Sequence, residues 1–232
     1  MSRADDVRAG LGRVRDRIDR AAAEAGRDPA AVTTVVVTKF FPESDLRILA
    51  DLGVRHVGEN RHQEAVEKVA ACADLPLTWH FIGGLQSNKA AAVASYAHVV
   101  ESVDRAKLVR GLQRGAHEHG RTLEVLLQVS LDPPDADGRA GADPSELEAL
   151  ATQVEEAGSL QLRGLMAVAP LGEDPTAAFA RLRRIREEFV ASRPGATTLS
   201  AGMSGDLETA VRAGATHVRV GSAILGPRPG DK

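Results

Sequence analysis

The chain has 232 residues, 43% of them hydrophobic, and 29 basic side chains nearly balance 32 acidic ones. This composition supports a substantial core, the formal net charge of -3 excludes a basic nucleic-acid-binding protein, and the single cysteine, Cys72, excludes an internal disulfide and a cysteine-based zinc site. No apolar stretch approaches the roughly 20 residues that span a bilayer, and the N-terminus lacks the apolar segment of a signal peptide, so we expect a soluble, cytoplasmic protein.

The N-terminal segment has the pattern of an amphipathic helix. Its apolar residues recur at three- and four-residue spacing, at Val7, Leu11, Val14 and Ile18. Ser2 is placed to cap the start of this helix and Gly26 to end it. We therefore predict one helix ahead of the first strand.

Short runs with strand character follow, each separated from the next by a segment with helical character. The predicted strands are 33–38, 56–59, 78–83, 98–102, 124–130, 162–168, 198–201 and 217–220. The predicted helices cover 44–53, 61–73, 86–95, 104–120 and 204–213, and two more begin after Asp143 and after Asp174.

Local signals predict where some helices begin and which face they bury. The N-cap, first-turn and capping-box pattern of one helix comprises Asp143, Pro144 and Glu146. The residues expected to face the core are Val66 and Val69 in the helix 61–73, and Phe179, Leu182, Ile185 and Phe189 in the helix after Asp174.

The alternation of strands and helices predicts the fold. Short strands separated by helices, with no hairpin signal such as Asn-Gly between them, indicate parallel pairing with right-handed crossovers. The repeats predict an α/β protein with a single (β/α)8 barrel of the TIM type and an extra N-terminal helix, forming one domain over residues 1–232. A doubly wound open sheet is the alternative, although no Gly-x-Gly-x-x-Gly turn follows the first strand.

Lys39 ends the first strand, whose Val and Thr residues indicate burial on both faces. Lysine is almost never fully buried without a partner, so Lys39 is either a surface or ion-paired charge or is held inside for chemistry. Burial beside valines and two phenylalanines would lower the pKa of an amine, and a neutral amine attacks carbonyl groups. Lys39 could then form an imine with an aldehyde cofactor or with a carbonyl substrate.

In a TIM-type barrel the active face lies at the C-terminal ends of the strands, and the loops after strands seven and eight commonly bind phosphate. The residues that would converge on this face are Lys39, Asn60, Gly83, Ser130, Met166, Ser200 and Gly221. The two phosphate loops would supply Ser200, Gly202, Ser204, Gly221 and Ser222. Glycine lets backbone N–H groups approach phosphate oxygens, and the helix expected at Ser204 would point its positive end inward. Alternatively, these Gly and Ser residues only form turns and caps.

An imine-forming lysine opposite a phosphate site suggests pyridoxal phosphate (PLP) as the cofactor. Arg219 lies two residues before Gly221 on the eighth strand, so the two positions face the same way. A guanidinium stays charged, and placed against a pyridine nitrogen it would disfavour protonation of that nitrogen. The ring would then be a weaker electron sink. The alternative for Arg219 is an ion pair with Glu or Asp of a neighbouring strand.

Several segments occur in the order of a known protein family. They are VTK at 37–39, VGENRHQE at 57–64, WHFIGGLQSNK at 79–89, GLM at 164–166, LSAGMS at 199–204 and VRVGSAILG at 218–226. Through them the chain resembles the pyridoxal phosphate homeostasis protein family, whose barrel is similar to the N-terminal domain of alanine racemase. The likeness spans nearly the whole chain.

The resemblance implies roles for residues of the expected site. Lys39 would carry PLP as a Schiff base, and Arg219 would face the pyridine nitrogen. The residues near the cofactor ring would be Asn60 and Met166, and those holding the phosphate would be Ser200, Ser204, Gly221 and Ser222.

Other residues of the family pattern receive no chemical step, namely His80, Gln86, Asn88 and Lys89. We interpret His80 as a hydrogen-bonded core residue. Asn88 and Lys89 are interpreted as caps of the following helix or as contacts with a partner.

The chain departs from the family pattern near the expected site. Thr38 stands where Ser is frequent and Ser222 where Thr is frequent, so both positions keep a hydroxyl. Gly205 and Arg61 stand where Asp and Tyr are common, which changes the charge near the site and leaves the rate of ligand exchange open. The stretch 131–141 after the fifth strand is either a mobile lid or an ordinary exposed loop.

These inferences predict a PLP-binding protein without substantial turnover that buffers, carries or delivers its cofactor. A two-base racemase needs an acid or base on each face of the cofactor, and the only tyrosine, Tyr96, is not expected to reach the second face. The expected partners are PLP and apo forms of PLP-dependent enzymes, without nucleic acid, membrane or metal, and we expect a monomer. The alternatives are an amino-acid racemase of the alanine-racemase type, a Schiff-base aldolase whose lysine is free at rest, and a barrel in which Lys39 is structural.

Overall fold

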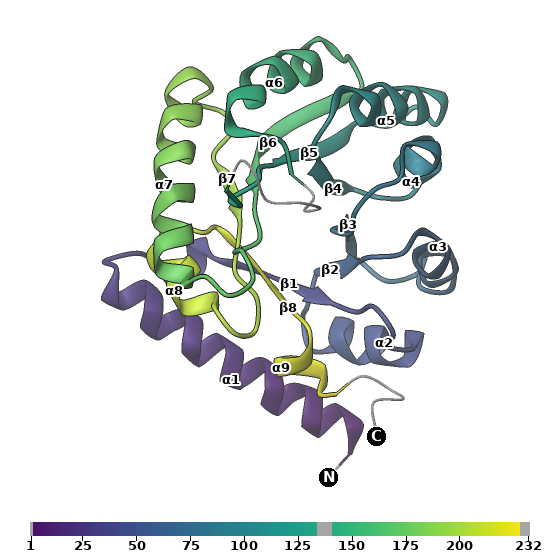
Figure 1. Cartoon of the computed structure of the whole chain (residues 1–232). Coiled ribbons are helices and arrows are strands. Elements are labelled where there is room, and N and C mark those ends of the chain that lie inside the picture. The colour runs from purple at the N-terminus through teal and green to yellow at the C-terminus, as the bar shows by residue number, and fades with distance from the viewer. Residues whose placement is uncertain (1, 134–140, 228–232) are drawn as a thin grey trace. The chain divides into compact units, whose positions relative to one another are not determined.

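The structure, a computed structural model, describes residues 2–133 and 141–227. In these residues strands and helices alternate along the chain after a first helix (Figure 1). The strands are β1 Thr33–Val37, β2 His56–Glu59, β3 Thr78–Phe81, β4 Val99–Val103, β5 Leu123–Gln128, β6 Leu160–Met166, β7 Thr198–Ser200 and β8 His217–Val220. Their order is that of a closed barrel, and β1 pairs in parallel with both β2 and β8. The predicted (β/α)8 barrel is confirmed, and the open-sheet alternative is wrong.

Helices precede, connect and follow these strands. The α-helices are α1 Arg3–Glu24, α2 Glu43–Asp51, α3 His62–Ala71, α4 Ala90–Ala94, α5 Ala106–Glu118, α6 Leu147–Glu156, α7 Pro175–Ser192, α8 Leu207–Arg212 and α9 Ser222–Leu225. Short 3-10 helices cover Pro29–Ala31 (η1), Ser87–Lys89 (η2) and Pro144–Glu146 (η3). The helix predicted ahead of the first strand is α1.

The predicted helix starts are confirmed where a side chain caps the helix. At the start of α1 the Ser2 hydroxyl accepts a hydrogen bond from the backbone N–H of Asp5, whose carboxylate accepts from Ser2 in return. Asp143 and Glu146 form the same reciprocal pattern before α6, and Asp174 caps α7. These caps satisfy N–H groups that a helix start otherwise leaves without partners.

The end of the chain differs from the sequence prediction in two helices. The helix expected at Ser204 begins three positions later, at Leu207. The Asp206 carboxylate accepts a hydrogen bond from Met203 N at 2.6 Å, which holds the intervening residues in a turn instead of a helix. The four-residue α9 directly after Gly221 was not predicted, because one helical turn is too short to show a periodic pattern.

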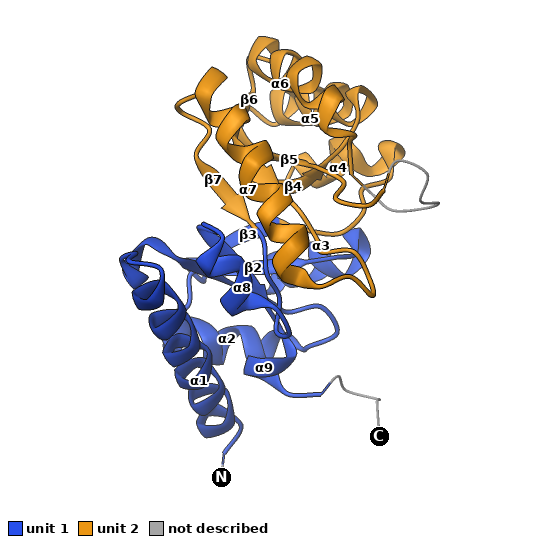
Figure 2. Ribbon diagram, turned by 60° about the vertical axis from the view of Figure 1, so that its left-hand side comes forward, with its two compact units in different colours: residues 1–80, 201–232 blue, residues 81–200 orange. Residues whose placement is uncertain are grey.

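The described chain divides into two compact units (Figure 2). Unit 1 comprises residues 1–80 and 201–232, and unit 2 comprises residues 81–200. That the whole chain forms one domain stays a prediction.

Unit 1 has a core between its strands and its helices. Val36 of β1 and Val218 and Val220 of β8 pack into a cluster with the apolar face of α1. The helix α1 also packs against α8 and α9 (Figure 1). Val35 pairs with Arg219, and because side chains alternate along a strand, these two residues face the inner side of the strands.

The buried face of α3 in unit 1 is not the one that its apolar residues predict. Val66 is 43% exposed, and Val69 is only half-buried against the core. The buried positions of α3 are instead Ala65 and Lys68. The expectation that Val66 faces inward is therefore wrong.

Unit 2 contains the parallel strands β4 to β7, and its helices α5 and α6 pack against this sheet. The predicted face of α7 is confirmed, with Phe179, Leu182 and Phe189 buried and Ile185 half-buried. Residues 134–140, which make up most of the stretch predicted as a lid or loop, lie outside the described residues.

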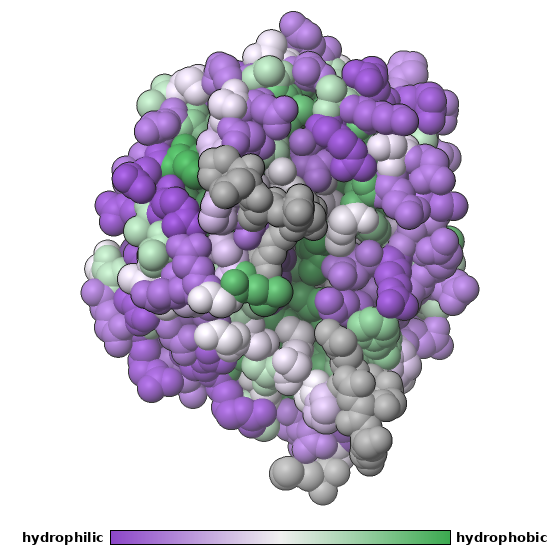
Figure 3. Space-filling model, in the orientation of Figure 1, coloured by the Kyte–Doolittle hydropathy of each residue, from purple (hydrophilic) through white to green (hydrophobic). Residues whose placement is uncertain are grey.

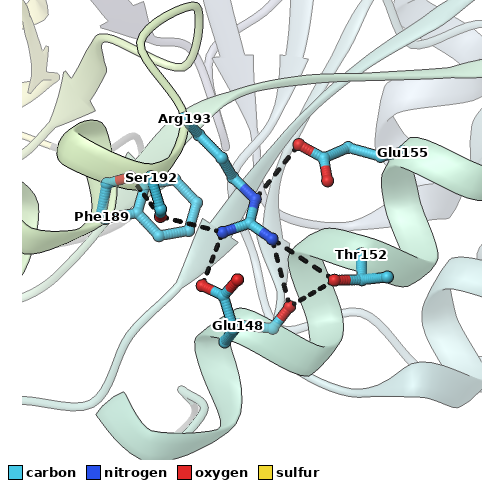
Figure 4. A network of polar contacts seen from close by, with 6 residues as sticks. All are labelled: Glu148, Thr152, Glu155, Phe189, Ser192 and Arg193. Atoms are coloured by element: carbon cyan, nitrogen blue, oxygen red, sulfur yellow. Dashed lines mark hydrogen bonds and ion pairs between the residues drawn. The ribbon is translucent and has the colours of Figure 1, made fainter.

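A buried arginine ties α7 to α6 in unit 2 (Figure 4). Arg193 is 9% exposed. Its guanidinium donates to the Glu148 carboxylate at 2.6 Å, forms an ion pair with Glu155 at 3.1 Å and lies 5.5 Å from the centre of the Phe189 ring. This arrangement pairs a buried cation with two carboxylates.

Hydrophilic side chains cover most of the face drawn in Figure 3. Among the described residues, the large hydrophobic side chains that are exposed are Val66, Leu171 and Met203. No helix in the described part of the chain has both the length and the apolar character that a membrane span requires.

Candidate functional site

Lys39 lies in a tight turn directly after β1. Thr38 N donates to Gly58 O of β2 at 3.0 Å, and Phe41 N donates to Thr38 O at 3.0 Å, which closes the turn around Lys39. Lys39 is half-buried, and Phe41 is 5% exposed. The lysine is therefore held at the C-terminal end of β1, and it is not a fully exposed surface charge.

The loop after β7 is joined to β8 within unit 1. Ala201 N donates to His217 O at 3.0 Å, and Arg219 N donates to Gly202 O at 2.9 Å. Gly202 has a φ of 92°, and a Cβ there would lie 2.6 Å from the Cβ of Ala210. Both the conformation and the close contact require glycine.

Gly221 brings the loop after β8 to the strand that ends before Lys39. The parallel pairing of β8 with β1 places Gly221 beside Val37. A Cβ at Gly221 would lie 3.1 Å from Val37 O and 3.3 Å from Val37 Cβ. Ser222 is exposed and begins α9. The two predicted phosphate loops and the Lys39 turn thus lie at the same end of the strands in unit 1.

Arg17 of α1 holds the loop that carries Ser204. Its guanidinium donates to Ser204 O at 2.9 Å and to both carboxylate oxygens of Glu208 at 2.6 and 2.8 Å. These hydrogen bonds from Arg17 lower the pKa of Glu208 below its ordinary value. Ser204 is half-buried. The first helix of the chain therefore fixes the backbone of a predicted phosphate loop.

Asn60 and Arg219 complete the part of the site in unit 1. Asn60 is half-buried and follows the last residue of β2, the strand whose Gly58 carbonyl accepts from Thr38 N. Arg219 is 4% exposed. The predicted site residues that unit 1 brings to one end of its strands are Lys39, Asn60, Ser204, Arg219, Gly221 and Ser222.

The other two predicted site residues, Met166 and Ser200, are neighbours in unit 2. They end β6 and β7, pair in register, and are 1% and 0% exposed. The Ser200 hydroxyl donates to Oε2 of Glu101, a fully buried carboxylate of β4, at 2.6 Å. Sequence reasoning missed Glu101. A carboxylate in the middle of an apolar strand is the signal that could have found it.

A buried network of charged side chains supports the Lys39 turn, and it was not predicted either. Lys68 of α3 is 8% exposed and Glu59 of β2 is 1% exposed. Lys68 Nζ donates to Glu59 Oε1 at 2.9 Å and to Thr38 O at 2.7 Å. Burial raises the pKa of Glu59, an effect that Lys68 and the Thr38 hydroxyl oppose. The spacing of Glu64 and Lys68, four residues apart on one helix face, was the available signal.

Three histidines lie close together in unit 1, two of them at the N-terminal ends of their strands. His56 and His217 begin β2 and β8, and His80 of β3 is 3% exposed. His56 Nδ1 and His80 Nε2 share a hydrogen bond at 3.0 Å, and the ring centres of His80 and His217 are 6.3 Å apart. His80 is a hydrogen-bonded core residue, as predicted. In the described ranges, no group of three or more His, Cys, Asp or Glu side chains is arranged to hold a metal ion.

The motif residues before α4 do not cap that helix with their side chains. Asn88 belongs to the 3-10 helix η2, and Lys89 occupies the N-cap position of α4 without a side-chain capping hydrogen bond. Lys89 thus takes the predicted cap position of the following helix, whereas Asn88 does not. Contact with a partner stays a prediction.

The chain matches one protein family over nearly its whole length. Residues 11–229 match the family described as "Alanine racemase, N-terminal domain". A "Pyridoxal phosphate homeostasis protein" of Mycobacterium tuberculosis is 43% identical over 246 residues, covering 97% of this chain and 94% of that protein. A protein of the same name from Escherichia coli is 37% identical over 230 residues, with 97% of each chain covered.

The chain is also similar to a solved structure. It is that of PipY from Synechococcus elongatus with PLP bound, which is 40% identical and has a TM-score of 0.78. The similarity covers 90% of this chain and 100% of the PipY chain. It confirms the fold that the sequence motifs predicted.

Proposed function

The chain belongs to the family of pyridoxal phosphate homeostasis proteins, which have the fold of the alanine racemase N-terminal domain, and from this premise we propose that it binds PLP on Lys39 as a Schiff base. The protein would buffer, carry or deliver PLP in the cytoplasm without substantial turnover of its own. Apo forms of PLP-dependent enzymes would receive the cofactor.

One observation carries this proposal: in unit 1 the loops after β7 and β8 lie at the same end of the strands as the Lys39 turn. Gly202 and Gly221 let these loops pack closely against α8 and against Val37, which brings their backbone next to the Lys39 strand. Helix α9 begins at Ser222, and the first N–H groups of a helix lack intrahelical acceptors, so they favour a phosphate. These features of unit 1 support the proposal that it binds both the aldehyde and the phosphate of PLP.

PLP supplies an aldehyde and a phosphate when it is bound. The Lys39 amine attacks the aldehyde carbon, a C=N bond forms and water leaves. Ser204, Gly221 and Ser222 would hold the phosphate. Met166 and Ser200 of unit 2 are proposed to contribute to ring and phosphate binding.

Arg219 supports a binding role over turnover. Its guanidinium is buried, at 4% exposed, and stays charged at any working pH. If it faces the pyridine nitrogen, it disfavours protonation there and weakens the ring as an electron sink. Tyr96 follows α4 and precedes β4, at the N-terminal ends of the strands in unit 2, which argues against it as a second racemase base.

The test of this proposal is the colour and chemistry of the purified protein. We expect visible absorbance of a Schiff base that borohydride bleaches, with a mass increase confined to the peptide that contains Lys39. In Lys39→Ala the covalent link should be lost while weaker binding through the phosphate contacts remains. A colourless protein that takes up no PLP would instead favour the aldolase or a structural lysine.

A second measurement separates a carrier from an enzyme. A carrier should transfer PLP to an apo-enzyme, detected as recovered activity of that enzyme, and should not interconvert amino-acid enantiomers. Racemisation that disappears in Lys39→Ala would favour the racemase alternative.

A further inference from the structure

The most unusual feature outside the proposed PLP contacts is the buried ionic network formed by Glu59, Glu64 and Lys68, which we call the Lys68 clamp. We propose that the Lys68 clamp is a positioning device: it fixes the backbone on both sides of Lys39 and thereby sets how readily the lysine amine reacts with PLP. This inference rests on the proposed attachment of PLP to Lys39.

The clamp bonds the peptide groups on both sides of Lys39. Lys68 Nζ donates to the carbonyl of Thr38, the residue before Lys39, at 2.7 Å. The Glu64 carboxylate accepts from the backbone N–H of Phe40, the residue after Lys39, at 2.5 Å. Because Glu64 and Lys68 are also paired with each other at 2.6 Å, one turn of α3 holds both flanks of Lys39 at once.

The turn that is held in this way is strained. Phe40 has a φ of 69° and is the one non-glycine residue with a positive φ in residues 2–133 and 141–227. A side chain in this region costs about 1–2 kcal/mol. Phe40 N donates to a carboxylate, and hydrogen bonds from backbone N–H groups to carboxylates are of the stronger, charge-assisted kind. The Arg61 guanidinium also lies 4.9 Å from the centre of the Phe40 ring, so residues of the β2–α3 segment determine the turn.

The buried charges of the Lys68 clamp carry a cost in free energy, so a contribution to stability is not a sufficient explanation for the clamp. Lys68 is 8% exposed, and Glu59 accepts hydrogen bonds from Lys68 and from the Thr38 hydroxyl, the latter at 2.6 Å. The second oxygen of Glu59 is buried and has no hydrogen-bond partner among the residues that the structure describes. Moving each ion from water into the protein interior costs several kcal/mol, and replacing a buried ion pair by apolar residues of similar volume often leaves the stability unchanged or raises it. On the same helix the apolar Val66, which follows the buried Ala65, is exposed, whereas Lys68 is buried.

Arg193 provides a matched comparison (Figure 4). Lys68 and Arg193 are both buried cations, 8% and 9% exposed, and each is paired with two glutamates. Arg193, however, joins α6 to α7 in unit 2 and holds no residue next to Lys39. Loss of either cation should lower stability, whereas only loss of Lys68 should change the chemistry of Lys39.

The experiment measures the rate at which added PLP forms its Schiff base with protein stripped of PLP, followed by visible absorbance. In Lys68→Met we expect this rate to fall by about tenfold to a hundredfold, because a displacement of about 1 Å in a reacting group can cost that much. Arg193→Met should keep the wild-type rate, and circular dichroism would check that both variants are folded at the assay temperature.

A second pair of variants tests the same point through Glu64. Glu64→Gln keeps an oxygen acceptor for Phe40 N and should retain most of the rate, whereas Glu64→Met removes the acceptor and should slow the reaction. This pair carries the test if Lys68→Met does not fold.

Three results would overturn the inference. They are a wild-type rate in folded Lys68→Met, equal slowing in Lys68→Met and Arg193→Met, or equal rates in the two Glu64 variants. A wild-type protein that forms no Schiff base at all would instead overturn the proposed function, and the inference with it.

Discussion

Two glycines show how single residues shape the proposed phosphate loops. Gly202 adopts a φ of 92°, which side-chain-bearing residues rarely adopt, and it lies under the first turn of α8. Gly221 has no such conformation but lies against Val37, where an added Cβ would come within 3.1 Å of a backbone oxygen. In both places the absence of a side chain lets two backbone segments approach each other.

Gly202→Ala is expected to destabilise the protein by about 1–3 kcal/mol. The new Cβ would lie 2.6 Å from Ala210 Cβ and 3.2 Å from Leu207 Cα, so α8 would have to move. The measurement is the free energy of unfolding in urea. Gly205→Ala is the control, since its Cβ would meet nothing within 4 Å, and its effect should stay within about 0.5 kcal/mol. Equal losses in the two variants would contradict this account.

At the scale of helices and strands, the sequence predicted those features that depend on neighbouring residues, such as strand-forming runs and helix caps. The β-branched run before Lys39 formed β1, and the caps at Ser2, Asp143 and Asp174 formed as expected. Prediction failed where a contact distant in sequence decides. Lys68 is buried because Glu59 and the carbonyl of Thr38 accept hydrogen bonds from its ammonium group. The periodicity of apolar residues carries no information on such partners.

The start of α8 is a second case of this kind. Ser204 has the residue type of an N-cap, and the sequence pattern alone places a helix there. In the structure the Asp206 carboxylate accepts from Met203 N, and the Ser204 carbonyl accepts from Arg17 of α1. The local turn and the distant arginine together displace the helix start, which a single-sequence pattern could not show.

The contact between α1 and α8 predicts a pH dependence of stability. Hydrogen bonds from Arg17 lower the pKa of Glu208 from its ordinary value of 4.5. A carboxylate with a lowered folded-state pKa adds stability above its unfolded-state pKa, and this stability is lost as the pH falls through the folded-state value. Arg17→Met should therefore cost about 1 kcal/mol at pH 7, in keeping with a partly exposed pair, and progressively less below pH 4.5.

Urea unfolding of wild type and Arg17→Met at a series of pH values checks this expectation. Arg183→Met is the control, because Arg183 and Glu187 form an ion pair at 2.8 Å that is mostly exposed, with side-chain exposures of 63% and 58%. Its effect should be within about 0.5 kcal/mol at every pH. A cost in Arg17→Met that does not shrink in acid would show that Glu208 is not the titrating partner.

At the scale of the whole molecule, the site depends on barrel closure. Unit 1 is assembled from residues 1–80 and 201–232, and the pairing of β1 with β8 brings Gly221 beside Val37. The sequence could predict this meeting of distant segments only through the fold class, since neither segment carries a signal for the other. It could not predict the clamp or the Ser200–Glu101 hydrogen bond, which depend on individual side chains.

The residues proposed to bind PLP come from both ends of the chain. Bound PLP should therefore stabilise unit 1 as a whole against unfolding. A ligand that binds only the folded state stabilises it by about 2.7 kcal/mol at a concentration of 100 Kd. We expect PLP to raise the Tm of the wild type and to raise that of Lys39→Ala by less, because the covalent link is lost. Pyridoxine phosphate, which keeps the ring and phosphate but has no aldehyde, should raise both Tm values by the same smaller amount. Equal effects of PLP and pyridoxine phosphate on the wild type would contradict a stabilising C=N bond, and an equal effect of PLP on the wild type and on Lys39→Ala would contradict Lys39 as the attachment point.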